Sequence, residues 1–332
     1  MRFGAVPLAQ ALGAILAHSA HLHGGPIRKG RMLTPDDLAH MAAEGWRNVV
    51  VAQLDAGDVT EDAAATRLAQ ALVPHGQGLV LTEAFTGRVN LKATGPGIVA
   101  MDVGAIHALN RIHPAITLAT LPPFQRVGAG TLVGTVKIIA YAVPEMALAQ
   151  AVAVAKVAVR VLPVVRASAG LLLTEVPGQD GKLTAKGKRA VEARLRALGM
   201  RLAGVATVAH EAGAMAQALR ALPGEMLLIL TGSATSDLHD TGPEAVRAAG
   251  GTVARFGMPV DPGNLLFHGQ LGVRPVIGLP GCARSPALNG ADWVLERYAC
   301  GLVVTDDDIA GMGVGGLLKE IAIRPQPRDH QP

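Results

Sequence analysis

Alternating strands and helices in the second half of the chain constrain the fold most. Apolar runs typical of buried strands alternate there with helical segments of about ten to fourteen residues. The expected strands are 170–176, 201–209, 225–232, 252–256 and 274–281, and the expected helices are 186–199, 211–222, 242–251 and 285–299. This order predicts an α/β fold with a parallel sheet, whose ligands bind at the carboxyl ends of the strands.

Composition limits the class of protein. Half of the 332 residues are hydrophobic and only 17% are charged, which favours a large core over disorder. Aromatic residues make up 3% and the net charge is only +4, so we expect no nucleic-acid surface built on stacking platforms or a basic stripe. Two cysteines are too few for a disulfide framework and favour a cytoplasmic location.

The first half of the chain predicts a mixed α+β region. Residues 1–20 imitate a secretory signal, but we favour an amphipathic helix over 6–19. The run 146–165 is interrupted by Lys156 and Arg160, so we expect no membrane span. Further expected helices are 33–46 with a Thr34 cap, 59–73 with a Thr60 cap and 144–158 between the halves; expected strands are 47–54, 115–121 and 131–143.

The turn after the run "EMLLILTG" consists of small and hydroxyl residues. Backbone N–H groups approach a ligand closely in such a turn, and the helix expected from about Pro243 favours an anion at its start. Asp237 and Asp240 offer oxygen ligands to a divalent metal. The alternative is a plain loop with Asp240 as a helix cap. The turn residues are Thr231, Gly232, Ser233, Ala234, Thr235 and Ser236.

Two further turns follow. Asp261, Pro262, Gly263 and Asn264 form an ordinary turn signal. The run "IGLPGCARSP" shapes a tight loop in which Ser285 is expected to cap the next helix and Arg284 to meet an anion. Cys282 is interpreted as a buried or half-buried structural thiol rather than a nucleophile.

Three glycine- or histidine-rich segments match the patterns of dinucleotide-binding or metal-binding sites poorly. "GMGVGG" at 311–316 matches a dinucleotide fingerprint but follows an acidic segment rather than a strand. "RVGAGTLVG" has the wrong spacing for that fingerprint and favours a β-turn. His18, His21 and His23 have no nearby cysteine or carboxylate, so we favour a surface cluster over a metal site.

The order of these turns resembles the molybdopterin-binding domain of molybdenum-cofactor biosynthesis proteins. "TGSATSDLHDTGPEA" is similar to the family's T-G-G-[TS]-[GS] turn, with Asp240 in the position of its aspartate. "DPGN" and "GLPGCA" resemble the later motifs of the larger, MoeA-like members. "VPLAQALGAILAHS" and "GPIRKGRMLTPDDLAHMAAEGWRNVVV" resemble their N-terminal half. The run "GLPGCARSPALNGADWVL" is most similar to the molybdopterin-binding half of fusions with a molybdenum-cofactor nucleotidyltransferase.

The resemblance implies a fold, a ligand and site residues. It implies a MogA-like parallel-sheet α/β domain at 161–310, a mixed α+β region at 1–160 and a tail at 311–332. The implied ligand is molybdopterin or its adenylate, together with molybdate and Mg²⁺. Asp240 and Asp237 are the implied catalytic and metal-binding residues. The implied binding residues are Thr231, Gly232, Ser233, Ala234, Thr235, Ser236, Pro262, Gly263, Asn264, Gly278, Leu279, Pro280, Gly281, Cys282 and Ser285.

The sequence departs from the family pattern at two acidic positions and at three others. The family's second glycine is Ser233 here, and its G-E-x-D has become 237–240 without the glutamate. Thr184 or Lys186 stands where small members carry an acidic residue, and Asn-Pro is replaced by Cys282 and Ala283.

Two functions remain open on these residues. The first is a transferase that inserts molybdate into molybdopterin, with Mg²⁺ neutralising phosphate charge. The second is a non-catalytic carrier that serves a separate nucleotidyltransferase or molybdoenzyme. A nucleotide-binding oxidoreductase is disfavoured by the failed glycine fingerprint. Larger members of the family dimerise, so a homodimer is expected from the resemblance. Composition and hydropathy give no expectation of a nucleic-acid or membrane partner.

Overall fold

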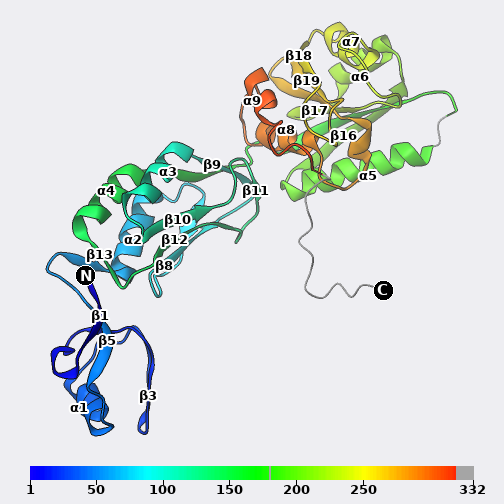
Figure 1. The fold of residues 1–332 in the computed structure, drawn as a ribbon. Coiled ribbons are helices and arrows are strands. Elements are labelled where there is room, and N and C mark those ends of the chain that lie inside the picture. Colours follow the sequence, from blue (N-terminus) through cyan, green and yellow to red (C-terminus); the bar gives the residue numbers. More distant parts are fainter. Residues whose placement is uncertain (179–180, 319–332) are drawn as a thin grey trace. The chain divides into compact units, whose positions relative to one another are not determined.

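The computed structural model describes residues 1–178 and 181–318 (Figure 1). The chain divides into two compact units. Unit 1 comprises Met1–Gly95 and Val99–Leu162, and unit 2 comprises Pro96–Ile98 and the chain from Pro163. The segment "RPQPRDHQP", expected to be a frayed end, lies outside the described residues.

The first part of unit 1 is built on a small sheet with the order β1-β5-β2. The expected helix over 6–19 is wrong. Val6 pairs with Val49 in the sheet, and Gly13 has a φ of +74°, which a helix does not tolerate. The expected helix with a Thr34 cap and the strand at 47–54 are confirmed. The elements are β1 (Arg2–Pro7), a 3₁₀ turn (Leu8–Gln10), β2 (Ile15–Leu16), β3 (Ala20–Leu22), β4 (Gly25–Ile27), α1 (Pro35–Ala43) and β5 (Asn48–Gln53).

The rest of unit 1 packs three helices against strands around an aliphatic core. The expected helix at 59–73 and the strand at 115–121 are confirmed, but the Thr60 side chain makes no cap hydrogen bond. The strand expected at 131–143 is divided into Leu132–Ile138 and Ala142–Pro144, which belong to different sheets. The helix expected between the halves instead packs inside unit 1 through Leu148, Ala151 and Ala155. The elements are β6 (Asp58–Thr60), α2 (Glu61–Leu72), β7 (Leu79–Leu81), β8 (Arg88–Ala93), β9 (Gly97–Met101), α3 (Val103–Ile112), β10 (Ile116–Thr120), β11 (Arg126–Val127), β12 (Leu132–Ile138), β13 (Ala142–Pro144), α4 (Glu145–Ala155) and β14 (Val159–Pro163).

Unit 2 is an α/β unit with a six-stranded, mostly parallel sheet in the order β16-β15-β17-β20-β19-β18. Strands β16, β15, β17 and β20 are parallel, while β19 runs antiparallel to both of its neighbours. The strands are β15 (Ser168–Glu175), β16 (Arg201–Ala209), β17 (Met226–Leu230), β18 (Thr252–Phe256), β19 (Phe267–Leu271) and β20 (Arg274–Gly278).

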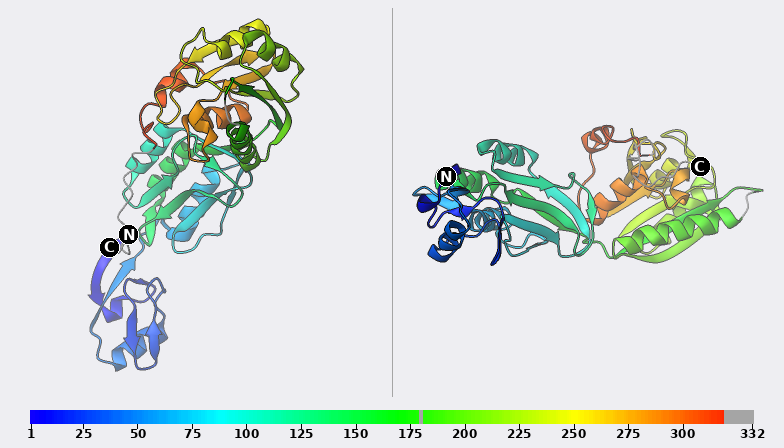
Figure 2. Two further views of the ribbon diagram at one scale, coloured as in Figure 1. Left: turned by 90° about the vertical axis from the view of Figure 1, so that its right-hand side faces the viewer. Right: turned by 60° about the horizontal axis from the view of Figure 1, so that its bottom comes forward.

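Helices cover both faces of this sheet (Figure 1). Leu171 and Leu173 of β15 join the core beneath α5 and α8, whereas Leu172 joins the core beneath α6 and α7. Figure 2 shows α5 as the long green helix along the sheet. The sheet is therefore buried on both sides, which explains the continuous apolar runs of its central strands. The helices are α5 (Gly181–Ala197), α6 (Ala212–Ala221), α7 (Thr241–Ala248), α8 (Gly290–Ala299) and α9 (Asp306–Gly311).

Several details of unit 2 differ from the sequence-based expectation. Strand β19 was not predicted, and α7 begins at Thr241 rather than near Pro243. Met312 is buried in the core and Leu318 packs against it, so packed residues extend into the expected tail. Within residues 1–178 and 181–318, no helix is both long and apolar enough to cross a membrane.

Asp37 fixes the start of α1 and gives a test of this part of the fold. Its carboxylate accepts hydrogen bonds from the Thr34 N–H at 3.0 Å and from Arg31 Nε at 3.1 Å. Burial raises the pKa of Asp37, but the bonds from Thr34 and the charge of Arg31 outweigh it and hold that pKa below its ordinary value. The stabilisation is therefore fully present above the unfolded pKa of about 3.9 and is lost as the pH falls through the lower folded value.

We predict that Asp37→Ala lowers the free energy of unfolding by about 1–2 kcal/mol near neutral pH, because the buried carboxylate of the Thr34 capping box is lost. The effect should shrink as the pH falls through the folded pKa of Asp37. Urea unfolding followed by Trp46 fluorescence in a Trp293→Phe background measures it. Asp36→Ala, in the same helical turn but exposed, is the control. An equal effect of both substitutions, or no pH dependence, would contradict the cap.

Candidate functional site

The turns after β17, β18 and β20 lie at one edge of the sheet. Strand β18 runs in the same direction as β20, because each is antiparallel to β19. Arg284, in the turn after β20, donates from Nη2 to the carbonyl of Thr231, after β17, at 2.6 Å. The N–H of Gly290 donates to the carbonyl of Pro262, after β18, at 2.8 Å. The three turns singled out in the sequence are therefore joined through the turn after β20.

The turn after β17 is closed by its own polar groups. Thr231 and Thr235 are buried, whereas Ser233, Ala234 and Ser236 are exposed. The Ser236 N–H and hydroxyl both donate to Asp240 Oδ2, at 2.9 and 3.3 Å. The exposed groups of this turn are thus small, which leaves its backbone accessible to a ligand.

Asp240 is the N-cap of α7. Its Oδ1 accepts the Thr241 N–H at 2.6 Å. Burial raises the pKa of Asp240, but hydrogen bonds from Ser236 and Thr241 and the nearby His210 bring it below its ordinary value. Asp240 therefore caps α7 in the structure. Its carboxylate oxygens still have lone pairs that can bind another ligand.

Asp237 is the second carboxylate of the predicted metal site. It is exposed, and its Oδ1 accepts the N–H of His239 at 2.7 Å. In the described part of the chain, no group of three or more His, Cys, Asp or Glu side chains could hold a metal ion. Metal binding by Asp237 and Asp240 stays a prediction, and it needs oxygen ligands from elsewhere.

Thr174 and His210 belong to this edge and were not predicted. Thr174 lies at the end of β15 and accepts the N–H of Gly232 at 2.7 Å on its Oγ1. The same oxygen lies 3.0 Å from Nδ1 of His210, which follows β16. Their positions at the ends of two strands, "LLLTE" and "TVAH", were the available signal.

The turn after β20 is anchored by buried groups. The Leu279 N–H donates to the carbonyl of Ile229 at 2.7 Å, and Pro280 is buried while Gly281 is exposed. Arg284 is half-buried, and burial lowers the pKa of its guanidinium. Its Nε has no hydrogen-bond partner among the described residues. A cation with one buried, unpartnered donor therefore lies beside the carbonyl of Thr231.

Cys282 and Ser285 correct the expectations made for this turn. Cys282 is exposed rather than buried, and its Sγ accepts a hydrogen bond from the amide of Asn289 at 3.0 Å. Ser285 does not cap the helix. Helix α8 begins later, with Asn289 as its cap in a capping box with Asp292.

Packing accounts for two of the predicted binding glycines. A Cβ at Gly278 would lie 1.9 Å from Cε1 of Phe267. Gly263 has a φ of +148°, and a Cβ there would lie 2.9 Å from Gly290. Pro262 is buried as well, whereas Asn264 is exposed. Both glycines are required by close contacts within unit 2, whether or not they also contact a ligand.

A buried arginine on α5 fixes the turn after β20. Arg194, 8% exposed, donates from Nε to Asp292 at 2.6 Å. Its Nη atoms donate to the carbonyls of Ala283 at 2.7 Å and Ser285 at 2.9 Å, among others. By engaging these carbonyls, Arg194 keeps the chain before Asn289 out of a helix. This is the physical reason why the predicted helix start at Ser285 was wrong.

We predict that Arg194→Met lowers the free energy of unfolding of unit 2 by about 3–5 kcal/mol, because Asp292 is left buried without its partner. Urea unfolding followed by Trp293 fluorescence in a Trp46→Phe background measures it. Arg189→Met, exposed on the same helix, should have little effect. Equal stabilities of the two variants would show that Arg194 does not hold this turn.

Comparisons with known proteins give limited matches. Residues 5–53 match a family described only as a domain of unknown function (DUF8806). No curated protein matches the sequence. The structure is similar to the molybdopterin biosynthesis MoeA protein from Pyrococcus horikosii, at 14% identity and a TM-score of 0.30, over 90% of this chain and 76% of that one. At this identity and TM-score the two proteins are not shown to share a family.

Proposed function

We propose that unit 2 is a MogA-like unit that binds molybdopterin at the carboxyl edge of its sheet, with the pterin phosphate at the turn 231–240. One observation carries the proposal: Arg284 joins the turn after β20 to Thr231, so the two turns that resemble the family's motifs lie together. They meet beside the N-terminus of α7, where backbone N–H groups and the helix dipole favour an anion.

The residues have separate roles in this proposal. The backbone N–H groups of 233–235 and the exposed hydroxyl of Ser233 donate to the phosphate, while Ser236 donates to Asp240. Arg284 supplies a positive charge near this turn; its Nε is buried and has no hydrogen-bond partner among the described residues. A guanidinium is suited to phosphate because it is planar and always charged. Thr174 holds the Gly232 N–H in place from the neighbouring strand.

Asp240 makes the proposed binding depend on a cation. An ionised carboxylate beside a phosphate is repulsive, and Mg²⁺ relieves the repulsion by binding both. Mg²⁺ commonly uses one or two carboxylates together with substrate phosphates, which fits Asp240 and Asp237 better than an all-protein cage. With magnesium in place, we propose that unit 2 inserts molybdate into molybdopterin or its adenylate.

A carrier without catalysis is the second candidate. The family's glutamate is missing between 237 and 240, and one oxygen of Asp237 is engaged by the His239 N–H. Fewer free carboxylate oxygens favour binding over metal insertion. In that case a separate nucleotidyltransferase or molybdoenzyme would take the pterin from this chain.

We predict that Gly232→Val weakens molybdopterin binding about a hundredfold, roughly 2.7 kcal/mol, because a branched side chain blocks backbone approach. Anaerobic titration of the full chain measures the affinity. Gly213→Val, at a helical glycine with nothing within 4 Å of an added Cβ, is the matched control. Unchanged affinity of Gly232→Val would remove this turn from the site.

We predict that Asp240→Ala lowers molybdate insertion about tenfold or more while changing pterin affinity less, because the lost contact is to the metal and is charge-assisted. Reconstitution of an apo-molybdoenzyme with molybdate and Mg²⁺ reads out insertion. Asp307→Ala, at an exposed aspartate in the first turn of α9, is the control. Equal losses of affinity and insertion would contradict the catalytic role, and tight binding with no insertion by the unaltered chain would establish the carrier.

A further inference from the structure

A series of hydrogen bonds runs from Gly232 through Thr174 to the ring of His210. The Gly232 N–H donates to Oγ1 of Thr174 at 2.7 Å, and the same oxygen lies 3.0 Å from Nδ1 of His210. Thr174 lies near the end of β15, and His210 directly follows β16, which pairs in parallel with β15. The series therefore links the turn after β17 to the carboxyl ends of two further strands of the sheet.

The buried Thr174 hydroxyl fixes the tautomer of the His210 imidazole. Thr174 is 2% exposed, so its hydroxyl hydrogen needs an acceptor within the protein. Its oxygen already accepts the Gly232 N–H, and the acceptor that the described residues offer the hydrogen is Nδ1 of His210. A nitrogen that accepts a hydrogen bond carries no proton, so the proton of the neutral imidazole is on Nε2.

The second ring nitrogen of His210 is left as an accessible donor. His210 is half-buried, and its Nε2 makes no hydrogen bond to the residues that the structure describes. Among those residues, the buried side-chain atoms without a partner include Nε2 of His268 but not Nε2 of His210. Solvent, or a ligand in its place, therefore reaches the Nε2–H of His210.

Asp240 locates this donor relative to the turn 231–240. Burial raises the pKa of Asp240, whereas local hydrogen bonds and the charge of His210 lower it. The His210 ring is therefore close enough to the Asp240 carboxylate to act on it. Because Nδ1 of the same ring is joined to the Gly232 N–H through a single oxygen, the imidazole lies at this turn.

We propose that His210 donates its Nε2–H to the anionic group of the ligand at the turn 231–240, in the tautomer that Thr174 imposes. The inference rests on the proposed function for the identity of that group, a phosphate, but it requires only that an anion binds at this turn. A donor that is oriented before the ligand arrives loses little freedom on binding. His210 contacts the ligand in this proposal, and Thr174 is a positioning residue.

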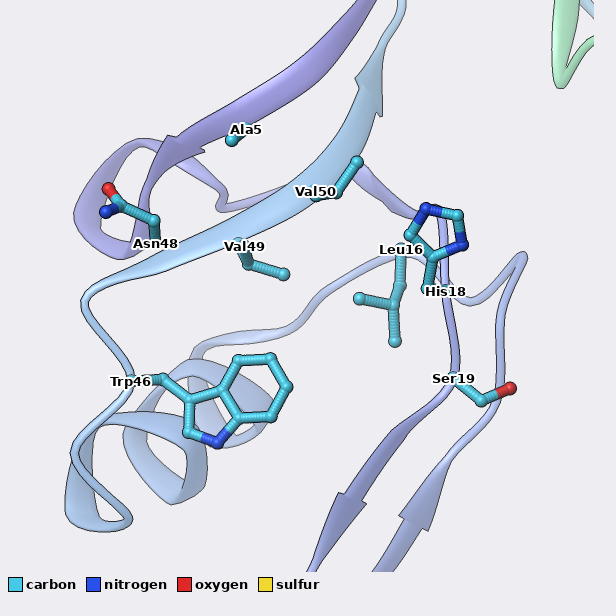
Figure 3. A pocket seen from close by; sticks show the side chains of 8 residues that line it. All are labelled: Ala5, Leu16, His18, Ser19, Trp46, Asn48, Val49 and Val50. Carbon is cyan, nitrogen blue, oxygen red and sulfur yellow. The ribbon is translucent and has the colours of Figure 1, made fainter.

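The first test is the tautomer of His210 in the full chain. Ring ¹⁵N chemical shifts distinguish Nδ1–H from Nε2–H, and at about pH 8 an ordinary imidazole is neutral. We expect His210 to be in the Nε2–H form alone. His18, an exposed residue at a pocket of unit 1 (Figure 3), is the internal reference. Its ring nitrogens make no hydrogen bond to the described residues, so it should show an average of both forms.

Substitutions at Thr174 test whether its hydroxyl sets the tautomer. Thr174→Val removes the donor and should give His210 an average of both forms, whereas Thr174→Ser keeps the hydroxyl and should retain Nε2–H. Should Thr174→Val fail to fold, the unaltered chain and Thr174→Ser still decide the tautomer. An Nδ1–H form of His210 in the unaltered chain, or an unchanged single tautomer in Thr174→Val, would overturn the proposal.

Inorganic phosphate tests the donor itself. Amide chemical shifts of 232–236 in the full chain, with Mg²⁺ present, measure the phosphate affinity. His210→Asn keeps an acceptor facing Thr174 but has no donor at the position of Nε2, and it should weaken phosphate about tenfold. His210→Gln carries an amide N–H that reaches the position of Nε2 and should retain more of the affinity. His18→Asn is the control and should have no effect.

The outcomes separate this proposal from the molybdopterin function. Phosphate binding at 232–236 that depends on His210, with no binding of molybdopterin, would support the proposal and contradict the function. Unchanged phosphate affinity in His210→Asn, or no phosphate-induced shift at 232–236, would overturn the proposal even where molybdopterin binds.

Discussion

The candidate site of unit 2 depends on one buried arginine. The Arg194 guanidinium makes hydrogen bonds to the Asp292 carboxylate and to carbonyls of Ala190, Ala283, Ser285 and Ala287. A charge this deeply buried is tolerated only when its donors are satisfied and an opposite charge is near. These requirements fix the path of the chain from the end of β20 to the start of α8. They also place Arg284 where it reaches Thr231.

Other contacts hold the neighbouring turns in place at the carboxyl edge of the sheet, beside the turn after β20. Thr174 holds the Gly232 N–H, and Asp240 closes the turn 231–240 onto α7. Gly278 and Gly263 permit close contacts with Phe267 and Gly290. Hydroxyls, backbone donors and one half-buried cation are thereby gathered at the edge where parallel sheets hold ligands. That combination suits a phosphate-bearing ligand more than an apolar one.

The sequence predicted the alternating strands and helices of unit 2 and the positions of its turns. It did not predict the contacts that hold those turns in place. Buried apolar runs indicate strands locally, so β15, β17 and β20 could be placed. The helix over 6–19 could not be excluded locally, because pairing of Val6 with Val49 is a long-range contact. Ser285 looked like a cap, yet Arg194, 91 residues earlier, engages its carbonyl. Thr174 and His210 carry no motif and are recognised only once β15 and β16 are adjacent.

Mapping molybdopterin onto the full chain tests the central claim most directly. Backbone amide chemical shifts would be recorded anaerobically with and without the pterin, in the presence of Mg²⁺. We expect the shifts to concentrate in 231–240 and 279–285, with the amides of residues 5–53 in unit 1 unchanged. Shifts confined to other parts of the chain, or none at saturating pterin, would contradict binding at the carboxyl edge of the sheet.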